Sequence, residues 1–169
     1  MPLMLAAGRV LAEDLVAKRA NPPHPNTAVD GYGFAGAAVG DGPQVLPLVD
    51  GRAAAGRPFG GVVPEGHAIR VLTGADLPTG VDTVVLDEDV RVGGGQVAFH
   101  GPLKPGANTR KAGEDVQAGD IALTQGRVLT PAELAMAAAV GHGEVLVHQR
   151  LRVAVLSAGD EIVERGAED

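Results

Sequence analysis

Glycine and proline interrupt this chain so often that a bundle of long helices is excluded. The sequence has 25 glycines and 12 prolines among 169 residues, spread over its whole length. Both residues weaken helices and mark turns. Turn-forming groups recur at short intervals between apolar runs, from Asp41-Gly42-Pro43 to Gln125-Gly126. This spacing predicts short strands folded as distorted barrels or sandwiches.

The apolar runs between the turns predict the strands and one hairpin. They lie at 45–49, 68–72, 83–92, 96–100, 121–123 and 144–148. The triple glycine at 93–95 separates two of these runs, which is typical of a β-hairpin. We expect the acidic residues Asp87, Glu88 and Asp89 to form a solvated face of the hairpin's first strand.

One helix is clearly signalled, at about 131–140. Thr130-Pro131-Ala132-Glu133 combines a capping box with a proline at the first helical position. The following alanine-rich run favours a helix, and Gly141 is suited to end it. The predicted fold class is therefore mainly β with one or two helices (α+β).

The domain organisation follows from the Pro-rich stretch at 21–26, which predicts an extended connector. We expect one β-rich subdomain with the helix from residues 1–18 and 119–150. A second subdomain, with the hairpin, spans 19–118. Arg152-Val153-Ala154-Val155-Leu156 is typical of a buried parallel strand. Residues 151–169 are therefore expected to begin an α/β domain that is truncated here.

Composition excludes several classes of function. A net charge of −7, a pI near 5.1 and 2% aromatic residues argue against nucleic-acid binding. The absence of cysteine excludes disulfides and thiolate metal sites. The longest apolar run, 134–140, is too short to cross a membrane. We expect a soluble cytoplasmic protein.

Four loops combine glycine with polar or acidic residues. Each could be an ordinary turn or surface loop, and each could also carry chemistry. Asp30 would present a carboxylate on a tight turn, and Thr73 would offer a hydroxyl to an oxyanion. Arg110 and Lys111 would grip phosphate beside a metal-facing Asp115. Asp160 and Glu161 follow the predicted parallel strand, where ligands bind in α/β sheets.

The ordered set of motifs closely resembles the N-terminal half of the molybdopterin molybdenumtransferases, the family of bacterial MoeA and the gephyrin E domain. The resemblance runs from Gly8 to about Arg165. It rests on the following segments, in this order: 8–14 (GRVLAED), 26–32 (NTAVDGY), 73–75 (TGA), 110–115 (RKAGED), 130–134 (TPAEL) and 157–161 (SAGDE).

The resemblance implies insertion of molybdate into adenylylated molybdopterin, with release of AMP and involvement of Mg²⁺. It implies that the catalytic residues are Asp30, Thr73, Asp115 and Glu161, and that Asp30, Asp115 and Glu161 hold or orient the metal. Arg110, Lys111 and Asp160 would bind substrate. It also implies a homodimer and a molybdopterin adenylyltransferase as partners.

Departures from the family pattern leave two hypotheses open. Thr27 and Val29 replace the usual Ser and Met, and only seven residues precede Gly8, so the usual N-terminal segment for dimerisation is expected to be missing. The chain is expected to be either the N-terminal part of such an enzyme or a non-catalytic interaction and assembly module of the same fold. In both cases we expect the isolated chain to be inactive.

We also expect the side chains of Glu114 and Asp115 to point in opposite directions, as neighbours in an extended loop do.

Overall fold

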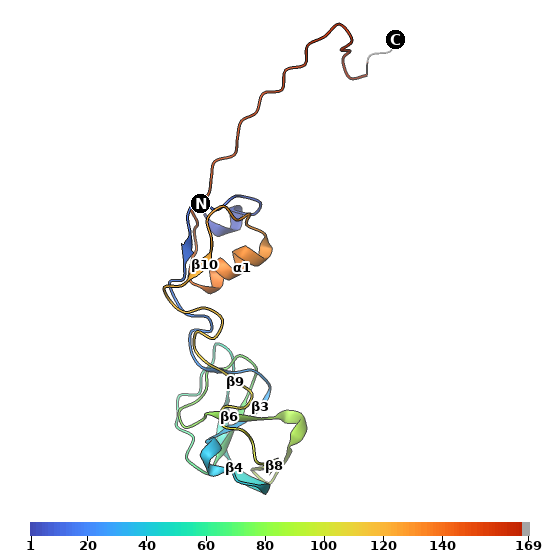
Figure 1. Cartoon of the computed structure of the whole chain (residues 1–169). Coiled ribbons are helices and arrows are strands. Elements are labelled where there is room, and N and C mark those ends of the chain that lie inside the picture. The colour runs from blue at the N-terminus through green and yellow to red at the C-terminus, as the bar shows by residue number, and fades with distance from the viewer. Residues whose placement is uncertain (167–169) are drawn as a thin grey trace.

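The computed structural model describes residues 1–166, and the fold is mainly β with one α-helix, as the sequence predicts (Figure 1). Three short 3₁₀ helices accompany it among these residues: η1 (Leu3–Leu5), η2 (Gly36–Ala38) and η3 (Asp87–Asp89). The strands and helix are β1 (Leu15–Val16), β2 (Asn26–Thr27), β3 (Gly31–Phe34), β4 (Gly42–Ala53), β5 (Ala68–Val71), β6 (Thr83–Leu86), β7 (Arg91–Gly93), β8 (Gln96–Gly101), β9 (Thr109–Arg110), β10 (Ile121–Leu123) and α1 (Pro131–Ala139).

A six-stranded sheet in the order β6-β3-β5-β4-β8-β7 dominates the larger body of the molecule. Strand β3 is antiparallel to both β5 and β6, whereas β4 and β5 are parallel. The long strand β4 joins the two halves of the sheet. Residues 42–47 pair with β8, and the pairing with β5 shifts register between Leu48 and Arg52. Strands β7 and β8 form the expected hairpin across Gly94-Gly95.

Aliphatic side chains cover both faces of this sheet. Ala68 packs into one hydrophobic cluster and its neighbour Ile69 into another, because successive strand residues point to opposite faces. The first cluster contains Phe34 and Phe99, whose rings stack with their centroids 5.1 Å apart. Strand β5 is therefore buried on both faces. This burial holds in place the end of the strand from which one of the loops of interest emerges.

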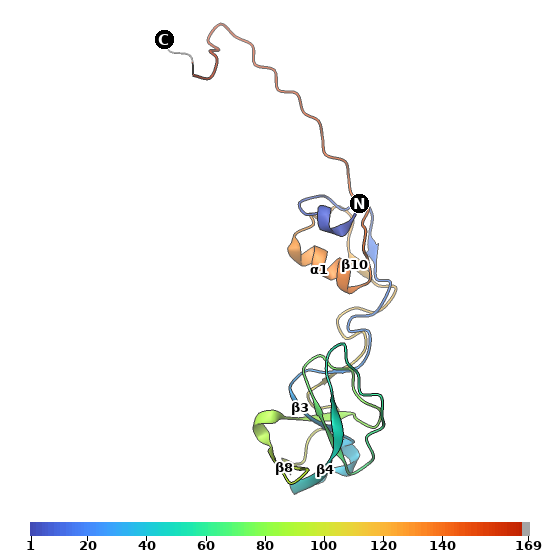
Figure 2. The same ribbon diagram turned by 180° about the vertical axis from the view of Figure 1, so that it is seen from behind.

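A smaller body contains α1, η1 and the β1–β10 pair (Figure 2). Its core joins residues that are far apart in the sequence. Leu11 and Leu15 pack in the same cluster as Leu129, Ala137 and Val140. The two polypeptide segments that link the smaller body to the sheet run side by side. They are joined by hydrogen bonds between the backbones of Asn21 and Val116, at 2.9 and 3.2 Å.

Helix α1 has the predicted signals at both ends. The backbone N–H of Thr130 donates to the Glu133 carboxylate at 3.0 Å, which completes the capping box. Gly141 has a φ of 95°, which suits glycine at this position. At the same end, the Arg19 Nε donates to the Ala139 carbonyl at 2.9 Å. The helix therefore anchors the chain where it enters the connector.

Three segments that the sequence predicts as strands differ from that expectation in residues 1–166. Residues 151–156 form no strand but continue as an exposed segment that leads away from the smaller body, on the side opposite the large sheet (Figures 1 and 2). A parallel strand needs a neighbour, and none pairs with this segment in residues 1–166. Residues 144–148 make only isolated bridges. The acidic run at 87–89 is the helix η3, so β6 ends before the hairpin begins.

Residues 167–169, at the end of the expected α/β start, lie outside the described residues. In the part that is described, no helix has the length and apolar character needed to cross a membrane.

The separate cores predict separate responses to mutation. Leu129 is fully buried in the smaller body, so Leu129→Ala should lower that body's free energy of unfolding by about 2–5 kcal/mol. A urea titration followed by two-dimensional NMR would show the signals of residues 123–145 disappearing at lower urea. The signals of β3 and β5 should be unchanged. Equal loss of both sets would show that the two bodies unfold as one unit.

Candidate functional site

Three strands of the large sheet bring their connecting loops to one edge. Strand β3 begins where β5 and β6 end, because it is antiparallel to both and Gly31 pairs with Val71 and Leu86. The residues just beyond these strand ends are therefore neighbours. The N–H of Asp87 donates to the backbone carbonyl of Asp30 at 3.1 Å.

Backbone hydrogen bonds join three loops at this edge, which we call the loop cluster: residues 26–30, 73–76 and 106–110. The N–H of Thr27 donates to the Ala75 carbonyl at 3.0 Å, and the N–H of Gly74 donates to the Thr27 carbonyl at 2.9 Å. The N–H of Ala28 donates to the Asn108 carbonyl at 2.9 Å. The loops are thus linked by main-chain contacts, which fix their relative positions.

Asp30 and Thr73, predicted on separate loops, are in direct contact. One oxygen of the Asp30 carboxylate, Oδ1, accepts from the Thr73 hydroxyl at 2.6 Å and from the Thr73 N–H at 2.7 Å. These two bonds hold the pKa of Asp30 below its usual range. The side chain lies at the surface, so a fixed, ionised carboxylate faces solvent at this point.

Gly31 permits this arrangement because the backbones of β3 and β6 approach closely there. A Cβ atom at this position would lie 2.0 Å from the carbonyl oxygen of Val85. Any larger residue would displace β3, and with it Asp30. The Asp-Gly pair therefore serves close strand packing as well as the turn.

Sequence reasoning missed a charged group beside Asp30. Arg70 makes a two-pronged ion pair with Asp87, with one hydrogen bond of 3.0 Å, and its guanidinium lies 5.0 Å from the centre of the Tyr32 ring. Arg70 lowers the pKa of Asp87 through this hydrogen bond. The available signal was an arginine within the otherwise apolar strand Ala68–Val71, just before Thr73-Gly74.

The predicted cationic loop is arranged differently from expectation. Glu114 and Asp115 both bind the Arg110 guanidinium, so they do not point in opposite directions. Residues 112–114 form a bend and turn instead of an extended strand, which explains the difference. Asn21 also donates to Asp115, at 3.1 Å, across the connector. Arg110 and Asp115 are thus partners of one another.

The remaining predicted residues lie apart from the Asp30–Thr73 pair. Lys111 lines a separate cavity. Asp160 and Glu161 are exposed in the segment beyond residue 150, which runs away from the large sheet. Within residues 1–166, no three acidic or histidine side chains come together as a metal site. The structure therefore does not bring Asp30, Asp115 and Glu161 together, and their joint metal role stays a prediction.

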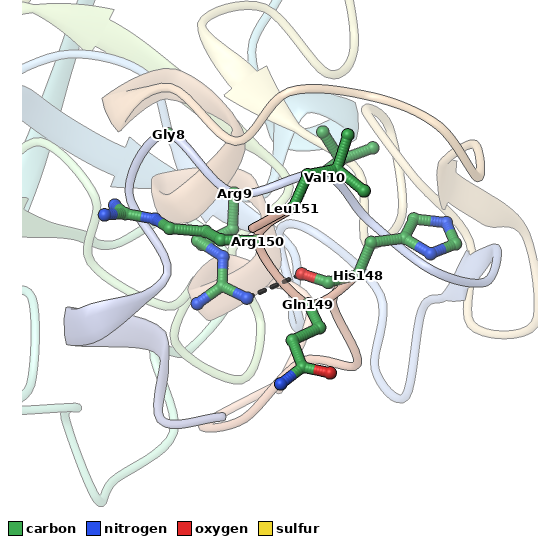
Figure 3. A pocket seen from close by; sticks show the side chains of 7 residues that line it. All are labelled: Gly8, Arg9, Val10, His148, Gln149, Arg150 and Leu151. Atoms are coloured by element: carbon green, nitrogen blue, oxygen red, sulfur yellow. Dashed lines mark hydrogen bonds between the residues drawn. The ribbon is translucent and has the colours of Figure 1, made fainter. Parts of the chain in front are cut away.

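A cavity of about 650 Å³ lies elsewhere, where the chain leaves the smaller body (Figure 3). In it, the Arg9 guanidinium donates to the His148 carbonyl at 2.6 Å. None of the predicted site residues lines this cavity. Its lining residues are Gly8, Arg9, Val10, His148, Gln149, Arg150 and Leu151. The cavity therefore contributes nothing to the candidate site.

Comparison with protein families gives one match that covers most of the chain. Residues 1–141 match the family of the MoeA N-terminal region (domain I and II). A molybdopterin molybdenumtransferase of Haemophilus influenzae is 42% identical over 166 residues, which are 97% of this chain and 40% of that protein. The corresponding protein of Synechococcus elongatus is 40% identical, over 96% of this chain and 41% of its own length.

Solved structures agree with the sequence match. A crystal structure of the molybdopterin biosynthesis moeA protein from Pyrococcus horikoshii OT3 superimposes with a TM-score of 0.81 and 36% identity. The match covers 87% of this chain and 40% of that protein. The chain thus spans about two fifths of the length of the curated relatives that it matches.

The contact between Thr73 and Asp30 predicts a pH effect. Thr73→Val removes the hydroxyl donor, so the pKa of Asp30 should rise towards its ordinary value; Thr124→Val, at an exposed position, should leave it unchanged. Because the folded-state pKa is depressed, the contact stabilises the fold above the unfolded-state pKa, and this stabilisation is lost as pH falls through the folded-state pKa. NMR titration of the Asp30 carboxyl carbon measures the shift. An unchanged pKa in Thr73→Val would contradict the assignment.

Proposed function

The chain belongs to the MoeA N-terminal region family, and from this premise we propose that it is the N-terminal part of a molybdopterin molybdenumtransferase. The proposed reaction inserts molybdate into adenylylated molybdopterin and releases AMP. Because the chain spans about two fifths of its relatives, it would supply one wall of the site and the remainder of the enzyme the other.

The observation that carries this proposal is the Asp30–Thr73 pair within the loop cluster. Asp30 is exposed, its pKa is depressed, and two bonds of 2.6 and 2.7 Å to Thr73 set its orientation. A carboxylate fixed in this way can orient a reacting group with little rearrangement, which is how a preorganised site increases rate. We propose that Asp30 performs this positioning role on the bound substrate.

The donor set at this edge fits a Mg²⁺ ion that takes most of its ligands from substrate and water. Mg²⁺ commonly binds one or two protein carboxylates together with phosphate oxygens. Thr73 occupies Oδ1 of Asp30, and within residues 1–166 no hydrogen bond reaches the other oxygen. Asp30 would hold the ion through that oxygen. When bound, Mg²⁺ would neutralise the repulsion between the carboxylate and the anionic substrates.

Asp115 and Arg110 have a supporting role in this proposal. Their ion pair, the Glu114 contact at 3.1 Å and the Asn21 bond at 3.1 Å hold the loop to the connector. Glu161 and Asp160 would contact the substrate only where the remainder of the enzyme positions their segment.

As partners we propose a second copy of the chain and the molybdopterin adenylyltransferase. The proposed location is the cytoplasm, with which a cysteine-free chain is compatible.

A chimera tests the proposal directly. In the Haemophilus influenzae relative, this chain would replace the matching segment, and the chimera would be expressed in bacteria that lack their own enzyme. We expect it to restore growth that depends on a molybdenum-cofactor enzyme. The purified 169-residue chain alone should release no AMP from adenylylated molybdopterin.

Two matched variants then locate the effect. In the chimera, Asp30→Asn should slow AMP release on the order of 100-fold, because one charged positioning group is lost. Asp41→Asn, an exposed carboxylate outside the loop cluster, should leave it unchanged. Equal rates in the two variants would remove Asp30 from the reaction. A folded chimera without activity would favour the non-catalytic assembly module.

A further inference from the structure

We propose that Lys104 and Lys111 form a binding site for a tetrahedral oxyanion, of the phosphate or molybdate class, in the cavity beside the loop cluster. The cavity has a volume of about 410 Å³. Its lining residues are Lys104, Pro105, Gly106, Ala107, Thr109, Lys111 and Glu114. The inference rests on the proposed function only for the identity of the natural ligand.

The distribution of lysine in the chain is the first argument. The sequence contains three lysines, at 18, 104 and 111, and two of them line this one cavity. Two turns bring them there. Each lysine carbonyl accepts a backbone hydrogen bond from the residue three positions later, from Ala107 at 2.9 Å and from Glu114 at 3.2 Å. In a chain with a net charge of −7, this is a local concentration of positive charge.

The second argument is that the neighbouring carboxylate is already engaged. Glu114 accepts from the Lys111 N–H at 3.0 Å and from the Arg110 Nε at 3.1 Å. These donors lower the pKa of Glu114 and neutralise part of its charge, since Arg110 is shared with Asp115. Among the ion pairs within residues 1–166, neither Lys104 nor Lys111 takes part. Two ammonium groups therefore remain available to an anion.

The third argument is the location of the cavity. Its wall from Lys104 to Thr109 runs into the loop cluster, where Asn108 accepts the Ala28 N–H at 2.9 Å. Asn108 also donates from its side-chain amide to the Val84 carbonyl at 2.9 Å, which holds the wall to the sheet. An oxyanion bound by the lysines would lie on a fixed wall that continues to the Asp30 loop. Lysine commonly binds phosphate as a point charge. Of the two residues that the sequence assigns to phosphate, Arg110 is occupied by two carboxylates and Lys111 is not, and the cavity adds Lys104.

Reductive dimethylation with ¹³C-formaldehyde tests the site, because it keeps the positive charge and labels the lysines and the Met1 amine. Inorganic pyrophosphate, AMP and molybdate would be titrated separately at constant ionic strength. We expect the Lys104 and Lys111 signals to shift together and saturate with at least one anion. The Lys18 and Met1 signals should stay in place. Equal small shifts at all four amines with every anion would overturn the proposal.

Variants of the unlabelled chain provide the second test. Lys104→Gln should weaken the anion that saturates the site on the order of tenfold, and Lys104→Arg should keep most of the affinity. Lys18→Gln, in the other body, is the matched control and should have no effect. Unchanged binding in Lys104→Gln would overturn the proposal. These measurements need no turnover, so they are independent of whether the chimera is active.

Discussion

The main-chain hydrogen bonds that join residues 26–30, 73–76 and 106–110 are the constraint on which the rest of the site depends. They connect three loops from separate parts of the sequence through the carbonyls of Ala75, Thr27 and Asn108. Main-chain bonds do not depend on side-chain identity at most positions. The substitutions Thr27 and Val29, which depart from the usual family pattern, are therefore compatible with the same loop arrangement.

The charges around these loops fall into two groups. Asp87 is paired with Arg70, and Glu114 and Asp115 are paired with Arg110. Paired groups at a partly exposed surface contribute little to stability but fix side-chain positions. Within residues 1–166, Asp30 is outside these pairs, its carboxylate accepts from Thr73, and Lys104 and Lys111 are also outside the pairs. The paired charges thus hold the scaffold, and the proposed ligand contacts fall on the charges that have no ion pair in the described part of the chain.

The sequence predicted those features that depend on local chemistry. The capping box at Thr130 and the glycines at 94 and 95 specify helix α1 and the β7–β8 hairpin through residues a few positions apart. Residues 151–156 form no strand in residues 1–166, because a parallel strand requires a partner elsewhere in space, and their place as the first strand of a further domain stays a prediction. The ordered motifs identified the family, which the comparison with known proteins confirmed.

The site was only partly predictable for the same reason. Asp30 and Thr73 were identified on separate loops, but their contact depends on the antiparallel register that places Gly31 opposite Val71. The role of Arg70 depends on Asp87, 17 residues away, and on a ring in a neighbouring strand. Lys104 belongs to no motif, and only the fold places it with Lys111.

Hydrogen exchange at the loop amides tests most directly whether the loop cluster is formed before any ligand binds. The N–H groups of Thr27, Ala28, Gly74 and Thr73 would be followed by NMR in the chain without ligand. Because each donates within the loop cluster, we expect protection comparable to that of the β3 and β5 amides. Exchange as fast as in the exposed segment beyond residue 150 would contradict a preformed site.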